Sequence, residues 1–340
     1  MSIELDPKKP RVLVALGGKS SERAVSIETG KNVANALEKL GYSVGIIDIG
    51  TGALMQTPEL DNIQKDASKL PAVSNIPLVD IKRHFELVFI AMHGKFGEDG
   101  GLQSLLENVD IPYTGSDPLS SALAMDKNHS KIVFKSDGIP VLDWEILTDQ
   151  NDKTKIKFPV VVKPNSEGSS VGVSICENEA DFVVGLKLAL QKCDKAMVEP
   201  YIKGREITVP VIERENGDAR ALPVIEIVPK NKFFDLKGKY DGSTDEIVPA
   251  KISPELTKQV QDLAVRAHLS LGCRHLSRVD MIIDDSGKIF VLELNTIPGM
   301  TAESLYPKSA AADKISFERL IDHIVMIALK SPDVLTKPTE

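Results

Sequence analysis

Two segments near the C-terminus place oxygen-bearing side chains on what read as neighbouring strands, SRVDM at residues 277–281 and VLELN at residues 291–295. Because side chains alternate along a strand, Glu293 and Asn295 share one face, and Asp280 can oppose them from the other strand. Such a cluster is costly without a cation. Mg²⁺ suits it, since this ion takes a few carboxylates and completes its shell with water and phosphate oxygens. The alternative is a hairpin with a solvated acidic face.

The composition is typical of a soluble globular protein with two or three domains. The 340 residues are 42% hydrophobic and 26% charged, which is enough for several cores. The net charge of -8 argues against a nucleic-acid or anionic-membrane surface, because such binding usually needs a basic stripe. No apolar signal core or spanning segment stands out. We therefore expect a cytosolic protein that holds phosphate through local groups.

The cysteines give no sign of a disulfide framework or a metal site. Cys176, Cys193 and Cys273 are odd in number and widely spaced, without a CxxC pair. We expect free thiols in a reducing compartment.

The start of the chain predicts a parallel α/β domain. RVLVAL at residues 11–16 is a buried strand, a helical pattern capped by Ser20 or Ser21 runs to Leu40, and SVGIIDI begins a second strand. ELVFIAMHG supplies a further buried strand before a glycine-rich loop. We place this domain at residues 1–116, with ligands at the carboxyl ends of its strands.

Two smaller domains are predicted to follow. Residues 117–200 contain helical patterns and a hairpin with a Gly/Ser-rich turn. Residues 201–340 contain alternating strands, a glycine-rich loop at residues 233–243, a helix at residues 254–272 and the acidic hairpin.

The N-terminal strand, glycine pair and helix imitate a nucleotide site, but the details exclude it. There is no GxGxxG, and Leu13 stands where a P-loop needs its first glycine. Glu22 is either an acid favoured by the helix dipole or a receptor for a ligand's ammonium group. In MHGKFGEDGGLQ, His93 either orients a substrate carboxylate or hydrogen-bonds its own loop.

A glycine- and serine-rich turn in FPVVVKPNSEGSSVGVSI predicts a hairpin whose tip folds over phosphates. Lys163 projects from its first strand as a point charge suited to phosphate. Ser169, Ser170 and the backbone N–H groups near Gly168 can bind anions without net charge. A plain flexible hairpin is the alternative.

Three further positions fit a nucleotide and an acyl-transfer site. In VEPYIKGREITV, backbone groups near Tyr201 can read adenine, and a carboxylate can take ribose hydroxyls. Arg278 lies two residues before Asp280 and shares its face, so it is either a structural ion pair or an oxyanion stabiliser. In PGMTAESL, the Gly299 N–H and the Ser304 hydroxyl lie where a helix begins and can receive a carboxylate.

Seven motifs, in order, resemble those of the D-alanine-D-alanine ligases, ATP-grasp enzymes of peptidoglycan precursor synthesis. They are GGKSSERAVS, MHGKFGEDG, VVKPNSEGSSVGVS, VEPYIKGREITV, FFDLKGKY, SRVDM and LELNTIPGMTAESL. The resemblance spans about residues 11–330. It implies a three-domain α/β architecture, in which an N-terminal parallel α/β domain precedes two α+β domains that clasp ATP, and it suggests a homodimer.

The resemblance also implies a role for each matching residue. The implied ligands are ATP and two Mg²⁺ ions, with Mn²⁺ as a substitute. At ATP, the implied residues are Lys127, Lys163 and Ser170 at the phosphates, Glu199 and Glu206 at the ribose, and the backbone of Pro200, Tyr201 and Ile202 at the adenine. At the metal they are Asp280, Glu293 and Asn295. For the two D-alanine molecules they are Glu22 at the first amino group with Ser169 and Tyr240 completing its cluster, Lys239 and His93 near the substrates, Arg278 and Gly299 at the oxyanion, and Ser304 at the second carboxylate.

The implied reaction has two steps. The carboxylate of the first D-alanine attacks the γ-phosphate of ATP to give an acyl phosphate, which the amine of the second D-alanine then attacks. The lid at Ser169 and the loop at residues 233–243 are expected to exclude water.

Two sequence features depart from the family pattern, and other functions are alternatives to the implied one. His275 stands where the family usually has a second glycine, and GLQS replaces the more usual TLQG. A ligase that uses D-lactate or D-serine is the nearest rival, and Tyr240 argues against D-lactate because phenylalanine accompanies ester synthesis. A catalytically silent ATP-binding regulator and a nicotinamide dehydrogenase are more distant alternatives.

Overall fold

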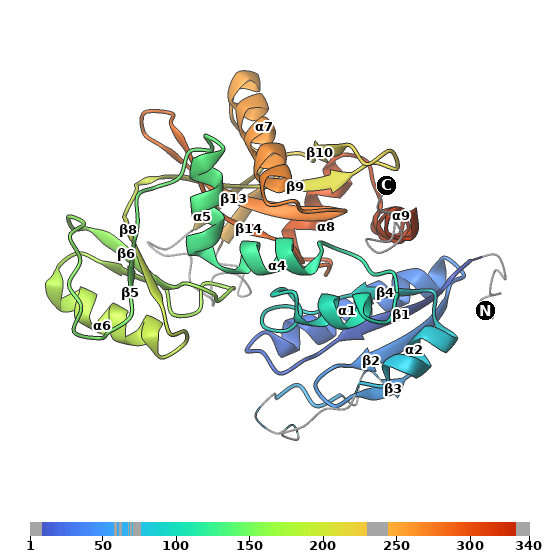
Figure 1. The fold of residues 1–340 in the computed structure, drawn as a ribbon. Coiled ribbons are helices and arrows are strands. Elements are labelled where there is room, and N and C mark those ends of the chain that lie inside the picture. Colours follow the sequence, from blue (N-terminus) through green and yellow to red (C-terminus); the bar gives the residue numbers. More distant parts are fainter. Residues whose placement is uncertain are drawn as a thin grey trace, which may run out of the picture.

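Three sheets follow one another along the chain (Figure 1). The computed structural model describes residues 9–57, 60, 63–66, 68, 70, 76–229 and 244–330. Within this described part, none of the helices has both the length and the apolar character needed to cross a membrane. The predicted α/β class is confirmed.

The first sheet has the strand order β3-β2-β1-β4. Its strands are β1 (Arg11–Leu16), β2 (Ser43–Asp48), β3 (Ala53–Met55) and β4 (Leu87–Ile90), and its helices are α1 (Arg23–Lys39), α2 (Leu78–His84) and α3 (Gly101–Glu107). β1 pairs in parallel with β2 and β4, while β3 is an antiparallel edge. Val12 packs into the core that contains α1, and Leu13 into the core that contains α2 and α3. Two covered faces explain why β1 is apolar throughout.

The second sheet is antiparallel and has the order β5-β8-β6-β7. Its elements are β5 (Glu145–Leu147), β6 (Val160–Pro164), β7 (Ser174–Cys176), α6 (Glu179–Leu190) and β8 (Ala196–Pro200). Val160, Val162 and Val198 pack with α6 in one core. The opposite face carries Lys163 and Glu199, because alternate residues of a strand point to opposite sides. The predicted hairpin is confirmed as β6 and β7.

The third sheet has six strands in the path β12-β11-β9-β13-β14, with β10 paired to β9. Its strands are β9 (Gly204–Glu213), β10 (Ala219–Ala221), β11 (Ile225–Pro229), β12 (Thr244–Ile247), β13 (Leu276–Asp284) and β14 (Ile289–Asn295). The remaining helices are α4 (Pro118–Met125), α5 (Lys127–Ser136), α7 (Pro254–Ser270), α8 (Leu305–Ala312) and α9 (Phe317–Lys330). Val209, Val279 and Val291 pack with α7.

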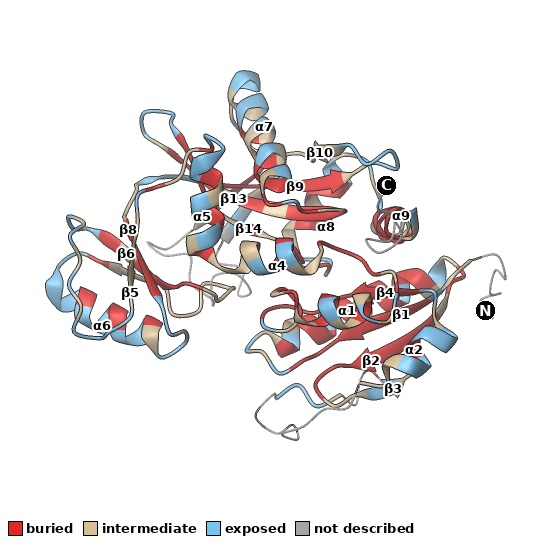
Figure 2. Cartoon of the chain, viewed as in Figure 1, coloured by how far each residue is buried: buried red, intermediate tan, exposed pale blue. Residues whose placement is uncertain are grey.

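Packing crosses the predicted domain limits at two places. Phe134 of α5 and Ala124 of α4 belong to the core of the third sheet, although both precede the second sheet in sequence. Leu320 and Ile324 of α9 belong to a core of the first sheet. Figure 2 shows the buried residues along these elements. The segment that carries Lys127 is therefore held by the third sheet, close to the acidic hairpin.

The predicted cap of the first helix is wrong. The N-cap of α1 is Glu22, and no side chain caps it. A turn closed by the Arg23 N–H and the Ser20 carbonyl, 3.2 Å apart, precedes the helix. Ser20 Oγ instead accepts from the Glu22 N–H at 3.3 Å and donates to the His93 carbonyl at 2.8 Å. The serine thus joins the two ligand-edge loops of the first sheet.

Candidate active site

A cavity of about 430 Å³ lies between the polar faces of the second and third sheets. Lys163 and Glu199 line it from the second sheet, and Asp280 and Glu293 line it from the third. The turn of the β6–β7 hairpin and the crossing at residues 200–206 complete its walls. The hairpin turn that we predicted to cover phosphates therefore forms a lid, residues 166–173, over a cavity lined by lysines and carboxylates.

The acidic hairpin has the predicted register. Asp280 lies opposite Glu293, and Arg278 lies opposite Asn295, so alternate residues place all four on one face. Arg278 donates to Asp280 from Nε at 2.9 Å and from Nη2 at 2.7 Å. Thr208 Oγ1 donates to the same carboxylate at 2.5 Å. Burial opposes the charge of Arg278, but Asp280 outweighs this effect and raises its pKa above the usual value.

The donor set fits a hard cation that also binds phosphate. Among the described residues, no three His, Cys, Asp or Glu side chains are arranged to hold a metal. The hairpin instead offers two carboxylates and the amide of Asn295, whose Oδ1 also accepts from the Ile297 N–H at 2.8 Å. Mg²⁺ typically takes one or two carboxylates and draws its other ligands from water and substrate phosphates. Asp280, Glu293 and Asn295 would hold it here.

Two of the predicted phosphate lysines are buried at the cavity. Lys127, at the start of α5, donates to the Glu167 carbonyl of the lid at 2.7 Å and lies 3.1 Å from Glu293 Oε2. Lys163 lies 2.5 Å from Glu199 Oε2. Burial opposes the charge of Lys163, yet the nearby carboxylates outweigh it, so the pKa of Lys163 is raised.

Glu199 is held more tightly than the sequence indicated, because a second lysine contacts it. Lys131, one helical turn after Lys127, is 1% exposed and donates to Glu199 Oε1 and to the Leu142 carbonyl, the latter at 3.1 Å. Burial opposes ionisation of Glu199, but the two lysines lower its pKa below the usual value. We did not predict Lys131. Its i,i+4 spacing from Lys127 in MDKNHSK was the available signal.

The crossing between the second and third sheets carries the predicted adenine-side residues. Pro200, Tyr201, Ile202 and Glu206 all line the cavity. The Tyr201 N–H donates to the Pro159 carbonyl at 3.0 Å, so this group is already used within the protein. Of the predicted residues, Lys239 and Tyr240 lie outside the described part of the chain, as does the whole loop at residues 233–243.

The lid reaches the first domain through Ser169. Its hydroxyl donates to Glu22 Oε1, and both Ser169 and Ser170 have positive φ, 51° and 57°. Glu22 Oε2 is buried and has no hydrogen-bond partner among the described residues. An unpaired buried carboxylate oxygen is costly, and an ammonium group from a ligand would satisfy it. Ser170 itself lines the cavity beneath the lid.

His93 lies under this region and is used by the protein itself. It is 4% exposed, and its Nδ1 lies 3.0 Å from the Ile297 carbonyl. Because a carbonyl only accepts, Nδ1 carries the proton, and Nε2 accepts from the Thr29 hydroxyl at 2.9 Å. Burial lowers the pKa of His93. Of the two alternatives for His93, the geometry favours support of the loops over a direct substrate contact.

The segment after β14 brings Gly299 and Ser304 together. A Cβ on Gly299 would lie only 2.7 Å from Ser304 Oγ, so a larger residue would displace that hydroxyl. Ser304 is the N-cap of α8 but makes no side-chain cap bond. Its Oγ instead accepts from the Thr301 N–H at 3.0 Å. Both predicted carboxylate-side groups are therefore adjacent at a helix start.

Two buried groups beside the site were assigned no functional role from the sequence. Arg23, next to Glu22, donates to both oxygens of Asp48 at 2.7 Å and to the Gly18 carbonyl at 2.9 Å. His275 is 1% exposed with φ 64°, and its Nδ1 accepts from the Gly115 N–H at 3.0 Å. The residue that replaces the usual glycine thus keeps the glycine-like conformation and ties the end of the first domain to the start of β13.

Comparison with known proteins places the chain in a family. Residues 11–116 match the family model described as D-ala D-ala ligase N-terminus, and residues 133–326 match the D-ala D-ala ligase C-terminus. The D-alanine–D-alanine ligase of Halalkalibacterium halodurans is 40% identical over 327 residues, covering 94% of this chain and 99% of the relative.

Two solved structures are similar throughout. The D-alanine–D-alanine ligase of Bacillus anthracis complexed with ATP has a TM-score of 0.76 at 34% identity, covering 94% of this chain and 97% of that one. The D-alanine-D-alanine ligase from Coxiella burnetii has a TM-score of 0.78 at 28% identity, covering 96% and 94%. These matches exclude the dehydrogenase alternative. The chain belongs to the D-alanine–D-alanine ligase family.

Proposed function

We propose that this chain joins two D-alanine molecules to D-alanyl-D-alanine at the expense of ATP, through a D-alanyl phosphate, and releases ADP and phosphate. The observation that carries the proposal is the contact of the lid with Glu22. It connects the lid of the cavity that Lys127 and Lys163 line to a buried Glu22 oxygen that has no hydrogen-bond partner among the described residues. Together with membership of the ligase family, this supports an active site for ATP and an amino acid side by side.

In the first step, the chain's own residues bring two anions together. Lys127 and Lys163 offset the charge of the ATP phosphates, and Glu22 binds the ammonium of the first D-alanine so that its carboxylate faces the γ-phosphate. Mg²⁺ bound by the acidic hairpin would neutralise phosphate oxygens. Ser169 and Ser170 hold the lid over the reacting groups and so exclude water, which would hydrolyse the acyl phosphate.

In the second step, the chain stabilises the charge that develops on the acyl oxygen. The Arg278 guanidinium and the Gly299 N–H are the proposed oxyanion donors. Ser304 receives the carboxylate of the second D-alanine. The pairing of Arg278 with Asp280 orients the guanidinium on the cavity face of β13.

We extend the proposal to the ligands and setting of the protein. Adenine contacts the crossing at residues 200–202, with Glu206 on the ribose side. Both oxygens of Glu199, which the resemblance implied for the ribose as well, are held by Lys131 and Lys163. Tyr240 and Lys239 act beside the substrates. Two Mg²⁺ ions, replaceable by Mn²⁺, bind the hairpin. The domains are residues 1–116, 117–200 and 201–340, and the protein is a cytoplasmic homodimer that binds neither nucleic acid nor membrane.

Phosphate release from ATP tests the function. We expect release that depends on D-alanine, with L-alanine, D-lactate and no added substrate giving only background, and loss of release when EDTA removes Mg²⁺. Chromatography should identify D-alanyl-D-alanine as the product. Phosphate release that ignores D-alanine would refute the proposed reaction, and full activity in EDTA would refute the metal assignment.

A further inference from the structure

One buried carboxylate in the nucleotide cavity is shared by two lysines from different elements. Glu199 of β8 is 2% exposed, and its two oxygens contact Lys131 of α5 and Lys163 of β6. Lys163 lines the cavity. Lys131 does not, and its ammonium is also held by the Leu142 carbonyl at 3.1 Å. The two lysines therefore differ in what they can reach: one faces the ligand space, and the other is anchored behind Glu199.

The arrangement has a consequence for any phosphate that enters the cavity. A phosphate and Glu199 are both anions, so they compete for the ammonium group of Lys163, and we take Lys163 to leave Glu199 when ATP binds. A buried carboxylate that loses its only cation is strongly unfavourable. With Lys131 in place, Glu199 keeps a cation after Lys163 has left, so the exchange does not leave an isolated buried charge.

We propose that Lys131 is a positioning residue that keeps Glu199 charged and in place, and so frees Lys163 to bind the phosphates of ATP. This inference rests on the proposed function, because it takes the cavity to be the ATP site. Lys131 itself touches neither the phosphates nor the reacting atoms. Its effect on ATP passes entirely through Glu199 and Lys163.

The electrostatics of the cluster agree with this division of roles. Burial is the main cause that lowers the pKa of Lys131, while Glu199 acts in the opposite direction. The pKa of Lys163 is raised, because Glu199 and Glu293 outweigh its burial. Lys163 thus has a second carboxylate, Glu293, on the metal side of the cavity, and a phosphate bound there would draw it in that direction.

Lys131→Met tests the proposal with ATP and adenosine as probes. In this variant Glu199 still has Lys163 as its partner, so the protein should fold, but Lys163 can no longer leave without cost. We expect ATP affinity to fall roughly ten- to hundredfold, which corresponds to loss of a hydrogen bond to a charged group. Adenosine has no phosphate for Lys163 to bind, and its affinity should change less than threefold. Titration calorimetry without D-alanine measures both dissociation constants.

Three further variants separate positioning from a general structural effect. Lys135→Met is the matched control, because Lys135 lies one turn further along α5, is 64% exposed and pairs with Asp143 rather than Glu199. It should bind ATP as the wild type does. Lys131→Arg keeps the charge and should retain most of the affinity. Lys131→Met with Glu199→Gln removes both charges and releases Lys163, so it should bind ATP more tightly than Lys131→Met alone.

Each result decides the proposal. It is supported if Lys131→Met loses ATP but not adenosine and the Glu199→Gln change restores ATP binding. It is overturned if Lys131→Met binds ATP normally, loses both ligands equally, or gains nothing from Glu199→Gln. If Lys131→Met alone fails to fold, the double variant still decides, because it should fold and bind ATP within a few-fold of wild type. A protein that binds ATP but lacks D-alanine-dependent phosphate release would refute the proposed reaction and leave this test intact.

Discussion

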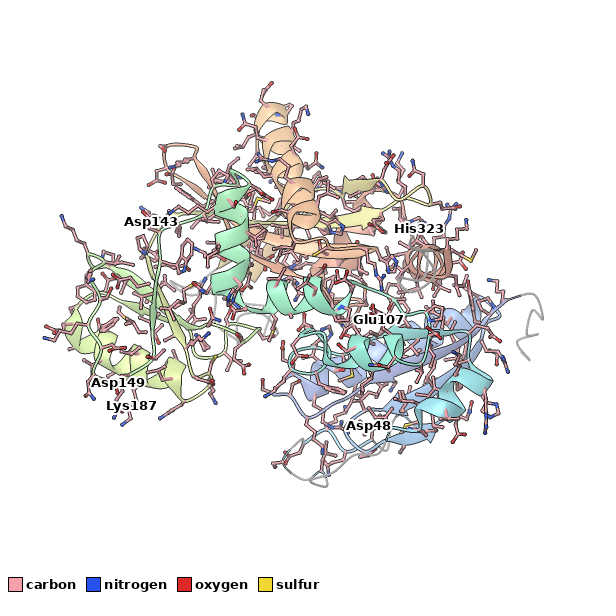
Figure 3. The ribbon with its side chains drawn as sticks, viewed as in Figure 1. Asp48, Glu107, Asp143, Asp149, Lys187 and His323 are labelled. Carbon is pink, nitrogen blue, oxygen red and sulfur yellow. The ribbon has the colours of Figure 1, made fainter. Side chains whose placement is uncertain are left out.

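Two buried clusters, each with a carboxylate and its cationic partners, differ in how the carboxylate is paired. In one cluster a single arginine holds the carboxylate, and in the other two lysines share it. In the first domain, Arg23 and Asp48 are 1% and 3% exposed and form a two-pronged pair. In the ATP cavity, Glu199 is divided between Lys131 and Lys163. Figure 3 labels Asp48 in the first domain and Asp143, the partner of Lys135, near α5.

The difference separates an ion pair that stays in place, Arg23 with Asp48, from a lysine that can change partners, Lys163 beside Glu199. Every Arg23 contact is internal, including those to the Gly18 and Gln64 carbonyls at 2.9 and 2.7 Å. These contacts hold Arg23 in place, so the pair fixes the loop that carries Glu22. A carboxylate with two cations can release one of them, and that suits a site where a lysine must change partners.

Removing one half of the saturated pair should have the largest effect. Arg23→Met leaves Asp48 as a buried carboxylate without its cation, and we expect the free energy of unfolding to fall by about 3 to 5 kcal/mol. Lys131→Met leaves Glu199 paired with Lys163 and should cost only about 1.5 to 3 kcal/mol. Urea unfolding of both variants measures the difference. A Lys131→Met variant that is as destabilised as Arg23→Met would show that Lys163 does not compensate for the loss of Lys131 at Glu199.

Arg278 forms a two-pronged pair like that of Arg23, but inside the active site. Its side chain is 16% exposed, and its partner Asp280 is a proposed metal ligand. Arg278→Ala should reduce turnover roughly 10²- to 10³-fold, or about 2.7 to 4 kcal/mol, through loss of an oxyanion donor. The matched control is Arg220→Ala, which breaks a partly exposed pair with Asp313 and should leave turnover unchanged. A loss of less than tenfold for Arg278→Ala would mean that the pair is only structural.

The sequence predicted the parts of this molecule that follow local rules. Strand alternation placed Arg278, Asp280 and Glu293 on one face, and the Gly/Ser turn predicted the lid hairpin. These predictions depend on residues close together in sequence or on the period of a strand. The family resemblance then connected the segments that periodicity alone could not.

Contacts between distant segments could not be predicted in the same way. Lys131 and Glu199 are 68 positions apart, and only the tertiary fold brings them together. The return of α9 to the first sheet, and the packing of α5 on the third, likewise depend on which apolar surfaces meet in space. The cap of α1 was missed because a turn before the helix directs Ser20 toward the neighbouring loop.

His275 offers a third way to bury a titratable group, which is to keep it neutral. Burial lowers the pKa of His275 from 6.5 to about 4. Arg274 and His268 lower this pKa as well, whereas Glu213 raises it. The unfolded chain therefore binds more protons between these values, and stability is lost as the pH falls from about 6.5 toward 4. At about 1.4 kcal/mol per pKa unit, this loss amounts to at most about 3.5 kcal/mol.

His275→Asn isolates this contribution. Asparagine tolerates positive φ and offers an oxygen to the Gly115 N–H, but it does not titrate. We expect the free energy of unfolding of the variant to fall less than that of the wild type between pH 6.5 and 4. Urea unfolding at several pH values measures both curves. Parallel curves would show that His275 does not contribute to acid sensitivity.

Glu22 stands beside the saturated Arg23 and is its opposite, since one of its oxygens accepts from Ser169 and the other has no partner among the described residues. We proposed that the ammonium group of D-alanine pairs with this oxygen, and Glu22→Gln removes the charge that attracts it but keeps the shape and the lid contact. We expect the D-alanine concentration for half-maximal rate to rise roughly ten- to hundredfold, about 1.5 to 3 kcal/mol, with little change in ATP affinity. Glu28→Gln, on the exposed side of the same helix, is the control and should behave as the wild type. An unchanged D-alanine dependence in Glu22→Gln would dismiss the ammonium site, whereas equal losses for D-alanine and ATP would assign Glu22 to the lid instead.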